Sequence, residues 1–287
     1  MRSVLPILTV LGAIVVLWYG ATVWLNAQWT YDQAARAGVE VSLPEVVTDT
    51  LSQERPVLPA PHQVAGGLWD GLLGQKVTSK RSLVYHGWVT LSATLLGFAI
   101  GTGAGILLAV GIVHNRAMDM SVMPWAIASQ TIPILAIAPM VIVVLASLGI
   151  TGLLPKAMIS AYLSFFPVVV GMVKGLRSPD HMQLDQMRTY NATRGQMFWK
   201  LRLPASMPYL FASLKVSVAA SLVGAIVGEL PAGASSGLGA RLLSGSYYGQ
   251  TIQIWSALFT AAILAALLVM IIGVLERRTL KRMGMVR

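Results

Sequence analysis

The sequence predicts an all-α, polytopic membrane protein with about six transmembrane helices and both termini in the cytoplasm. Apolar residues make up 55% of the 287 residues and charged residues only 11%, against about 25% charged residues in a typical soluble domain. The mean hydropathy is +0.69. Six apolar runs each reach the about 20 residues that a helix needs to cross a bilayer. We therefore expect residues 1–287 to form a single transmembrane domain embedded in lipid.

The six expected spans follow directly from these runs. A secretory signal peptide would have an apolar core of only about 7–15 residues; the first run is longer and carries aromatic residues near its far end, which suit a membrane interface. We therefore interpret it as an uncleaved span. Only residues 149–152 separate the third and fourth runs, which predicts a tight turn. The spans are Val4–Leu25, Trp88–Val113, Met123–Leu148, Leu154–Val173, Met207–Leu230 and Ile252–Leu275.

The distribution of positive charge predicts the orientation. With both termini inside, 13 of the 21 Lys and Arg residues fall in cytoplasmic segments and seven in outer segments, as the positive-inside rule requires. This placement explains most of the net charge of +10, so no nucleic-acid partner is needed. The chain has no cysteine, and its four histidines are scattered. We therefore expect no disulfide, metal or other cofactor.

Residues 27–86 form the expected periplasmic segment. Its first part, 27–57, is polar with little periodicity and is interpreted as a loosely structured insertion. A turn at Leu58-Pro59-Ala60-Pro61 follows. The apolar residues between Val64 and Leu73 then recur at helical spacing, which predicts an amphipathic helix on the outer membrane surface.

The expected cytoplasmic segment 174–206 contains signals for two short helices. Ser178-Pro179-Asp180 predicts the start of a helix that ends near Tyr190, because a hydroxyl cap, a proline and an acid suit a first turn. Asn191 tolerates the left-handed conformation that ends helices. The pattern of Thr193-Arg194-Gly195-Gln196 is a capping box, and it predicts a second helix that stops at Pro204. An ordinary amphipathic loop on lipid headgroups is the alternative.

These residues resemble a known family. Asp185-Gln186-Met187, Asn191 and the ending Leu201-x-Leu203-Pro204 resemble the EAA loop of permease subunits of binding-protein-dependent ABC importers, and their spacing matches it from end to end. Here Asp185 stands in place of a glutamate, Gln186 and Met187 in place of two alanines, and Asn191 in place of a glycine.

The resemblance extends over about residues 58–280 and points to the nitrate/sulfonate/taurine-type branch. Besides the turn at 58–61, the segments Ile132–Pro139, Phe165-Phe166-Pro167 and Gly237-Leu238-Gly239 look like those of this branch, the last together with Glu229. Residues 27–57 look like an insertion.

The resemblance implies a transport role without catalysis by this chain. It implies a bacterial inner membrane location, cytoplasmic ABC ATPase subunits, a periplasmic or surface solute-binding protein, and a second permease subunit, as a homodimer. The solute would be a small anion or organic nutrient, such as nitrate, a sulfonate, taurine, or a vitamin or pyrimidine precursor. The residues expected to couple the chain to the ATPase are Asp185, Gln186, Met187, Asn191, Gly195, Met197, Phe198, Leu201 and Pro204.

Prolines and polar residues within spans are the candidates for the solute pathway. Pro133 and Pro139 each remove a backbone hydrogen bond, and irregular backbone at membrane depth is tolerated only inside protein or beside a cavity. A kinked, purely structural helix is the alternative. The candidate lining residues are Gln130, Thr131, Pro133, Tyr162, Ser217, Ser221 and Glu229.

Other membrane residues have structural interpretations. Gly97, Gly101 and Gly105 form a small-residue stripe that predicts close helix packing. We expect Lys215 to extend to the inner headgroups, with a role in a cytoplasmic gate as the alternative. For Glu229, a hydrated interfacial carboxylate is the alternative to contact with the solute or binding protein.

Two other classes of protein compete with an ATP-driven permease. An ATP-independent channel or secondary transporter would need no docking loop and tends to show inverted repeats or midplane charges. An intramembrane enzyme is disfavoured, because the Gly-x-Ser-x-Gly string at 233–237 has no histidine after it. The sequence also contains no P-loop, so ATP hydrolysis is expected on another chain.

Overall fold

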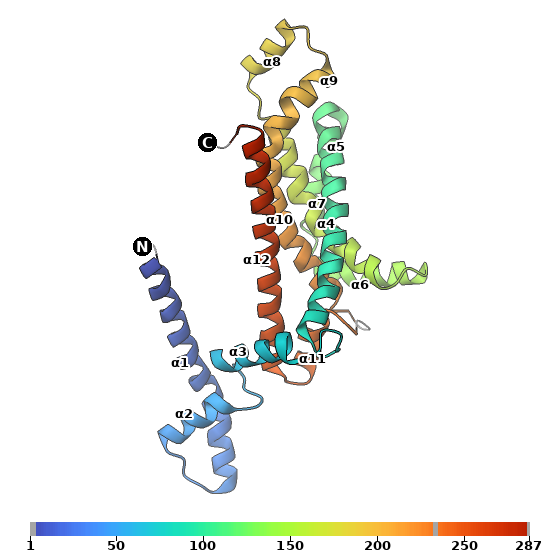
Figure 1. Ribbon diagram of the computed structural model, residues 1–287. Coiled ribbons are helices and arrows are strands. Elements are labelled where there is room, and N and C mark those ends of the chain that lie inside the picture. The colour runs from blue at the N-terminus through green and yellow to red at the C-terminus, as the bar shows by residue number, and fades with distance from the viewer. Residues whose placement is uncertain (1–3, 232–234, 286–287) are drawn as a thin grey trace. The chain divides into compact units, whose positions relative to one another are not determined.

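A computed structural model of this protein describes residues 4–231 and 235–285, and within these ranges all regular elements are helices. Gly233 and Ala234 of the Gly-x-Ser-x-Gly string lie outside the described residues. The chain divides into two units: residues up to His86 with Ala240–Thr260, and Gly87–Gly239 with residues from Ala261 onward. Helices α4 (Leu83–His114) and α12 (Thr251–Arg282) each contribute residues to both units (Figure 1).

The prediction of a polytopic, all-α membrane protein is confirmed. In the described part of the chain, five helical stretches are long and apolar enough to span a bilayer, and a bent pair adds a sixth candidate. That pair is α5 (Arg116–Ser129) and α6 (Ile134–Ser147), which meet at 100°. The third expected span is therefore not one straight helix. The cytoplasmic position of the termini stays a prediction.

The prediction that residues 27–57 are loosely structured is wrong. Helix α1 (Val4–Ala37) continues well beyond its apolar run, and α2 (Leu43–Ser52) follows. The fully buried Asn26 explains this order: its amide donates to the Leu58 carbonyl at 2.9 Å and accepts from the Val57 backbone N–H at 2.8 Å. A Ser42–Glu45 capping box starts α2. The long-range hydrogen bonds of Asn26 and the local cap of α2 thus replace the missing apolar pattern.

Unit 1 also contains the predicted amphipathic helix, as α3 (Pro61–Trp69) and a π-helical turn, η1 (Asp70–Gly74). The Trp18 indole donates to the Pro59 carbonyl at 3.0 Å, and its ring lies 5.0 Å from that of Trp255 at the start of α12. Helix α11 (Leu238–Tyr247) also belongs to this unit from Ala240 onward.

Unit 2 is built on two antiparallel neighbours, α7 (Leu153–Leu176) and α10 (Leu203–Gly228), which run alongside each other in Figure 1. Their close approach depends on small residues. A Cβ at Gly224 would lie 2.7 Å from the Ser160 Cα, and one at Gly175 would lie 2.9 Å from the Ser206 Cα. Without a hydrophobic driving force between helices in lipid, such close packing is a main source of helix association.

The glycine stripe on α4 packs as predicted. A Cβ at Gly97 would lie 2.6 Å from the Ala157 carbonyl oxygen, one at Gly101 2.8 Å from that of Ala161, and one at Gly105 2.9 Å from that of Phe165. Every contact is with α7. The three glycines therefore allow the backbones of α4 and α7 to approach directly, which confirms helix packing as their role.

The expectation that Lys215 extends to the inner headgroups stays a prediction, because its partner Glu276 lies just beyond the expected span Ile252–Leu275. The Lys215 ammonium on α10 forms an ion pair with the Glu276 carboxylate on α12. Both side chains are largely covered, with exposures of 34% and 19%. A charged group within a span lowers its desolvation cost by pairing, and the pair ties α10 to α12.

Candidate functional site: the α8–α9 loop

The clearest candidate site is the segment 177–203 between α7 and α10, here called the α8–α9 loop. It contains α8 (His181–Thr189), α9 (Arg194–Met197) and a π-helical turn, η2 (Phe198–Arg202). In Figure 1 it projects from the end of the α7–α10 pair. Every residue of α8 is at least partly exposed. The loop is therefore an ordered helical structure held out from the body of unit 2.

Helix α8 is fixed by a polar cap. The Asp180 carboxylate accepts from the His181 backbone N–H at 2.6 Å, and the Asp180 N–H donates to the Gln183 side chain at 3.1 Å. The predicted helix is present, but its cap is Asp180 rather than Ser178. Ser178 instead donates to the Gly175 carbonyl at 2.7 Å and ends α7.

The bend after α8 rests on Asn191, as predicted. Asn191 has φ of 52° and is the non-glycine residue with a positive φ in the described ranges. The Asn191 N–H donates to the Arg188 carbonyl at 2.8 Å, and the Ala192 N–H donates to the Met187 carbonyl at 3.0 Å. These bonds satisfy carbonyls that a helix end leaves unpaired. The loop therefore turns in a defined direction.

The second helix begins at the predicted capping box but does not stop at Pro204. The Gln196 N–H donates to the Thr193 hydroxyl at 3.3 Å, and the Thr193 N–H donates to the Gln196 side chain at 2.8 Å. From Arg194 the helical chain then runs without interruption to Gly228. In η2 the Leu203 N–H bonds to the Phe198 carbonyl, five residues back. This wider turn leaves space for the proline ring, which clashes with a carbonyl in a regular helix.

One side of the loop is anchored on unit 2. Phe198 packs against the core of α4 and α7, and its ring lies 5.3 Å from that of His114, edge to face. The Arg202 guanidinium donates to the Leu176 carbonyl at 3.4 Å. A cavity of about 240 Å³ lies beside this anchor, between Val110, His114, Arg194, Gly195 and Phe198.

Three large side chains of the loop are exposed to the surroundings. Met182 is 78% exposed, Tyr190 75% and Trp199 67%. Asp185 and Arg188 form an exposed ion pair of 2.9 Å, which contributes little to stability. Exposed apolar side chains on a short, ordered helix are typical of a surface that binds another protein.

The predicted coupling residues lie in this loop, except for Pro204 in the first turn of α10, and they have different environments. Phe198 faces the unit 2 core, and Asn191 forms the bend. The exposed members are Asp185, Gln186, Asn191 and Gly195, and the half-buried members are Met187, Met197, Phe198, Leu201 and Pro204. Their coupling role stays a prediction.

The predicted pathway residues fall into two groups. Gln130 and Thr131 lie in the break between α5 and α6, and Pro133 caps α6. The Tyr162 hydroxyl on α7 donates to the Ser129 carbonyl at the end of α5. These four residues therefore come together at one irregular backbone site.

The second group is buried between helices. The Ser217 hydroxyl donates to the Ser164 carbonyl, and the Ser221 hydroxyl donates to the Thr94 carbonyl at 2.8 Å. Both serines are 0% exposed. In this structure they connect α10 to α7 and α4, and their role in a pathway stays a prediction.

Glu229 is also 0% exposed, so the alternative of a hydrated interfacial carboxylate is wrong. Its carboxylate accepts from the Thr90 hydroxyl at 2.9 Å and from the Gly239 N–H at 2.9 Å. The Thr90 hydroxyl also accepts from the Leu238 N–H at 2.8 Å. Glu229 thus holds the chain after the glycine-rich loop against the end of α10.

Sequence reasoning missed two features, of which a pattern could have revealed only the first. Ser213, Ser217 and Ser221 recur every four residues on α10, a small-residue spacing that indicates helix packing. Ser160 completes this polar seam: its hydroxyl donates to the Ser221 carbonyl at 2.8 Å. The partnership of Lys215 with Glu276 joins residues 61 positions apart, and no local pattern shows it.

Comparison with known proteins agrees with this architecture. The family model described as the binding-protein-dependent transport system inner membrane component matches residues 101–284. The chain is 32% identical over 221 residues to the riboflavin transport system permease protein RibX of Chloroflexus aurantiacus, which covers 77% of this chain and 78% of that protein.

Two further relatives carry related names. The formylaminopyrimidine transport permease protein ThiX of Halalkalibacterium halodurans is 33% identical over 150 residues, 52% of this chain and 58% of that protein. The putative aliphatic sulfonates transport permease protein SsuC of Bacillus subtilis is 25% identical over 196 residues, 68% of this chain and 69% of that protein. The resemblance to the sulfonate-type branch is thereby confirmed.

A solved structure has the same fold. A chain of the MetNI methionine ABC transporter in an inward-facing conformation superposes with a TM-score of 0.53 at 21% identity, covering 71% of this chain and 96% of that chain. The region that the family model matches, residues 101–284, includes the α8–α9 loop and the helices α7 and α10 on either side of it. This multi-pass membrane protein therefore belongs to the family of binding-protein-dependent transport system inner membrane components.

Proposed function

We propose that this chain is the permease subunit of an ABC importer in a bacterial inner membrane, and that the α8–α9 loop docks on a separate ATPase. Two copies would form the solute pathway. The observation that carries the proposal is the geometry of the loop: a capped helix with exposed Met182 and Tyr190, joined by a left-handed Asn191 to a helix that continues into a membrane span.

This geometry suits the transmission of force. A helix of nine residues such as α8 is marginal in isolation, so its exposed apolar side chains gain a stable environment only against a partner. The second helix passes into α10 without a flexible joint, so a displacement of the loop moves the span. An ATP-independent channel would not need a projecting loop that docks on an ATPase.

A matched pair of substitutions at Asn191 tests the proposal. Asn191→Gly should retain coupling, because glycine adopts a positive φ without strain, whereas Asn191→Val should lose most of it, because a β-branched residue resists that conformation. The measurement is ATP-driven solute uptake, together with co-purification of the ATPase, for the complete transporter in liposomes.

A second variant separates docking from loop geometry. Met182→Asp places a charge on α8, which has no buried residue. Membrane insertion should therefore be normal, while binding to the ATPase should fall. Phe198→Asp is less informative, because Phe198 also packs on the unit 2 core. Uptake by the chain alone without ATP, or unchanged uptake with Met182→Asp and Asn191→Val, would refute the proposal.

The relatives guide the search for the solute. Their names concern riboflavin, formylaminopyrimidine and aliphatic sulfonates, so we propose a small anion or a vitamin or pyrimidine precursor. The ligand of the solute-binding protein that acts with this chain would decide between them.

A further inference from the structure

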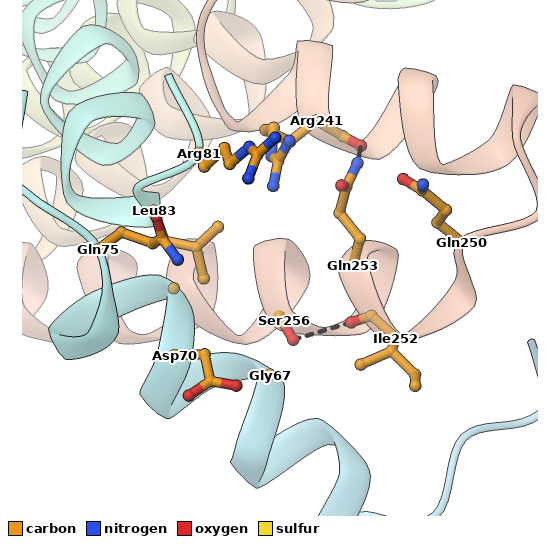
Figure 2. A pocket seen from close by; sticks show the side chains of 11 residues that line it. Gly67, Asp70, Gln75, Arg81, Leu83, Arg241, Gln250, Ile252, Gln253 and Ser256 are labelled. Carbon is orange, nitrogen blue, oxygen red and sulfur yellow. Dashed lines mark hydrogen bonds between the residues drawn. The ribbon is translucent and has the colours of Figure 1, made fainter. Parts of the chain in front are cut away.

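A cavity in unit 1 has no role in the proposed function. It has a volume of about 510 Å³ and lies among α3, η1, the start of α4, α11 and the start of α12. This size is within the range of about 300–1,000 Å³ that is typical of small-molecule sites. Figure 2 shows its lining side chains, among which are two arginines, Arg81 and Arg241, and three glutamines.

The cavity has a firm frame. A Cβ at Gly67 would lie 2.7 Å from the Ser256 Oγ, so α3 packs directly on the start of α12. The Gln253 amide donates to the Arg241 carbonyl at 3.0 Å and to the Ser244 hydroxyl at 3.1 Å, which fixes α11 on α12. The walls are therefore held by the close packing of Gly67 on side chains of α12 and by hydrogen bonds.

Its positive charges are unpaired within the part of the chain that the structure describes. Neither Arg81 nor Arg241 forms an ion pair there, and the Arg241 Nε is buried without a hydrogen-bond partner. Asp70 is the acidic residue of the lining, and in Figure 2 its carboxylate points away from the two arginines. Burial lowers the pKa of Arg241, which means that its charged form lacks stabilisation that an anion would supply.

We propose that this cavity binds an anionic oxygen group, namely a carboxylate, sulfonate or phosphate, through Arg81 and Arg241. The planar guanidinium group presents several N–H donors in a geometry that matches such oxyanions. The side-chain amides of Gln75 and Gln250 line the same space and add neutral hydrogen bonds. The group can come from a free anion or from a phospholipid headgroup.

The test is direct binding of inorganic sulfate to the full chain in nanodiscs of phosphatidylcholine. We expect saturable binding that Arg81→Gln and Arg241→Gln each weaken about tenfold or more, because each removes a charge-assisted hydrogen bond. Arg55→Gln is the matched control: Arg55 is an exposed arginine in the same unit that does not line the cavity, so sulfate binding should be unchanged.

A further arm identifies the source of the anion. Competition by phosphatidylglycerol in the nanodisc would indicate a headgroup, and no competition a free anion; each supports the site. Arg241→Lys, which keeps the charge but loses the planar fork, should show intermediate affinity. Absent sulfate binding, or binding that the arginine substitutions leave unchanged, overturns the inference. No arm requires ATP or the ATPase, so a failure of the proposed coupling would not affect the result.

Discussion

At the residue scale, Gly101 and Gly103 lie two positions apart on α4 in different surroundings. A Cβ at Gly101 would lie 2.0 Å from the Ser164 Oγ and 2.8 Å from the Ala161 carbonyl oxygen, whereas a Cβ at Gly103 meets nothing within 4 Å. Gly101→Ala should therefore lower the free energy of unfolding by about 1–3 kcal/mol through overpacking.

Gly103→Ala is the matched control for this prediction. It should be neutral or stabilise the helix by up to about 1 kcal/mol, because alanine is the better helix former. Thermal unfolding of the purified variants in detergent measures both effects. Equal midpoints for the two variants would contradict the close packing of α4 on α7.

The ion pair of Lys215 and Glu276 permits a second test at this scale. The pair is partly covered, so its coupling energy should lie between that of an exposed pair, about 1 kcal/mol or less, and that of a buried one. We expect Lys215→Met and Glu276→Gln each to destabilise the protein by about 2 kcal/mol, and the double variant to cost less than their sum. A double-mutant cycle of unfolding free energies measures this coupling, and strict additivity would argue against the pair.

At the scale of single elements, the cap of α9 fixes where the loop becomes helical. Thr193→Ala removes the hydroxyl that accepts the Gln196 N–H and should destabilise the helix start by about 1 kcal/mol. Amide hydrogen exchange should then quicken at residues 195–197. Thr193→Ser keeps the hydroxyl and should leave exchange nearly unchanged; similar rates in all three proteins would mean that packing of Phe198 alone orders this turn.

Local signals predicted elements well where the determining groups are close in sequence. Asp180, Asn191 and the Thr193–Gln196 box each act within four residues, so the helix starts and the bend of the loop could be anticipated. The continuation of α9 through Pro204 could not, because it depends on a wider backbone turn whose bonding pattern has no distinctive residue type. Pro133 and Pro139 indicated a break in the third span, but the 100° angle between α5 and α6 could not be predicted from nearby residues.

At the scale of the whole molecule, the absence of cysteine makes the orientation testable. Lys80 is exposed in the expected outer segment, and Arg188 is exposed in the α8–α9 loop. The variants Lys80→Cys and Arg188→Cys each introduce a single cysteine at one of these positions. A membrane-impermeant maleimide should label the first in intact spheroplasts, and the second only after permeabilisation. The reverse pattern would overturn the positive-inside assignment and the docking proposal together.

Composition and hydropathy were sufficient for the fold class, because burial in lipid demands long apolar helices whatever their partners. They were insufficient for residues 27–57, where order comes from Asn26 and the Ser42–Glu45 cap rather than from apolar periodicity. They also could not place Glu229, since its partners Thr90 and Gly239 come from distant segments. Hydrogen bonds between residues that are distant in the sequence could therefore not be predicted from it.

The uninterrupted helix from Arg194 to Gly228 has a consequence for the proposed coupling. Its 35 residues correspond to a length of about 50 Å at 1.5 Å per residue, and Glu229 binds the chain just beyond its far end. Under the proposed function, a displacement of the loop by the ATPase would therefore be carried along one continuous helix to the residues that Glu229 holds. The two ends of the proposed pathway would then change conformation together.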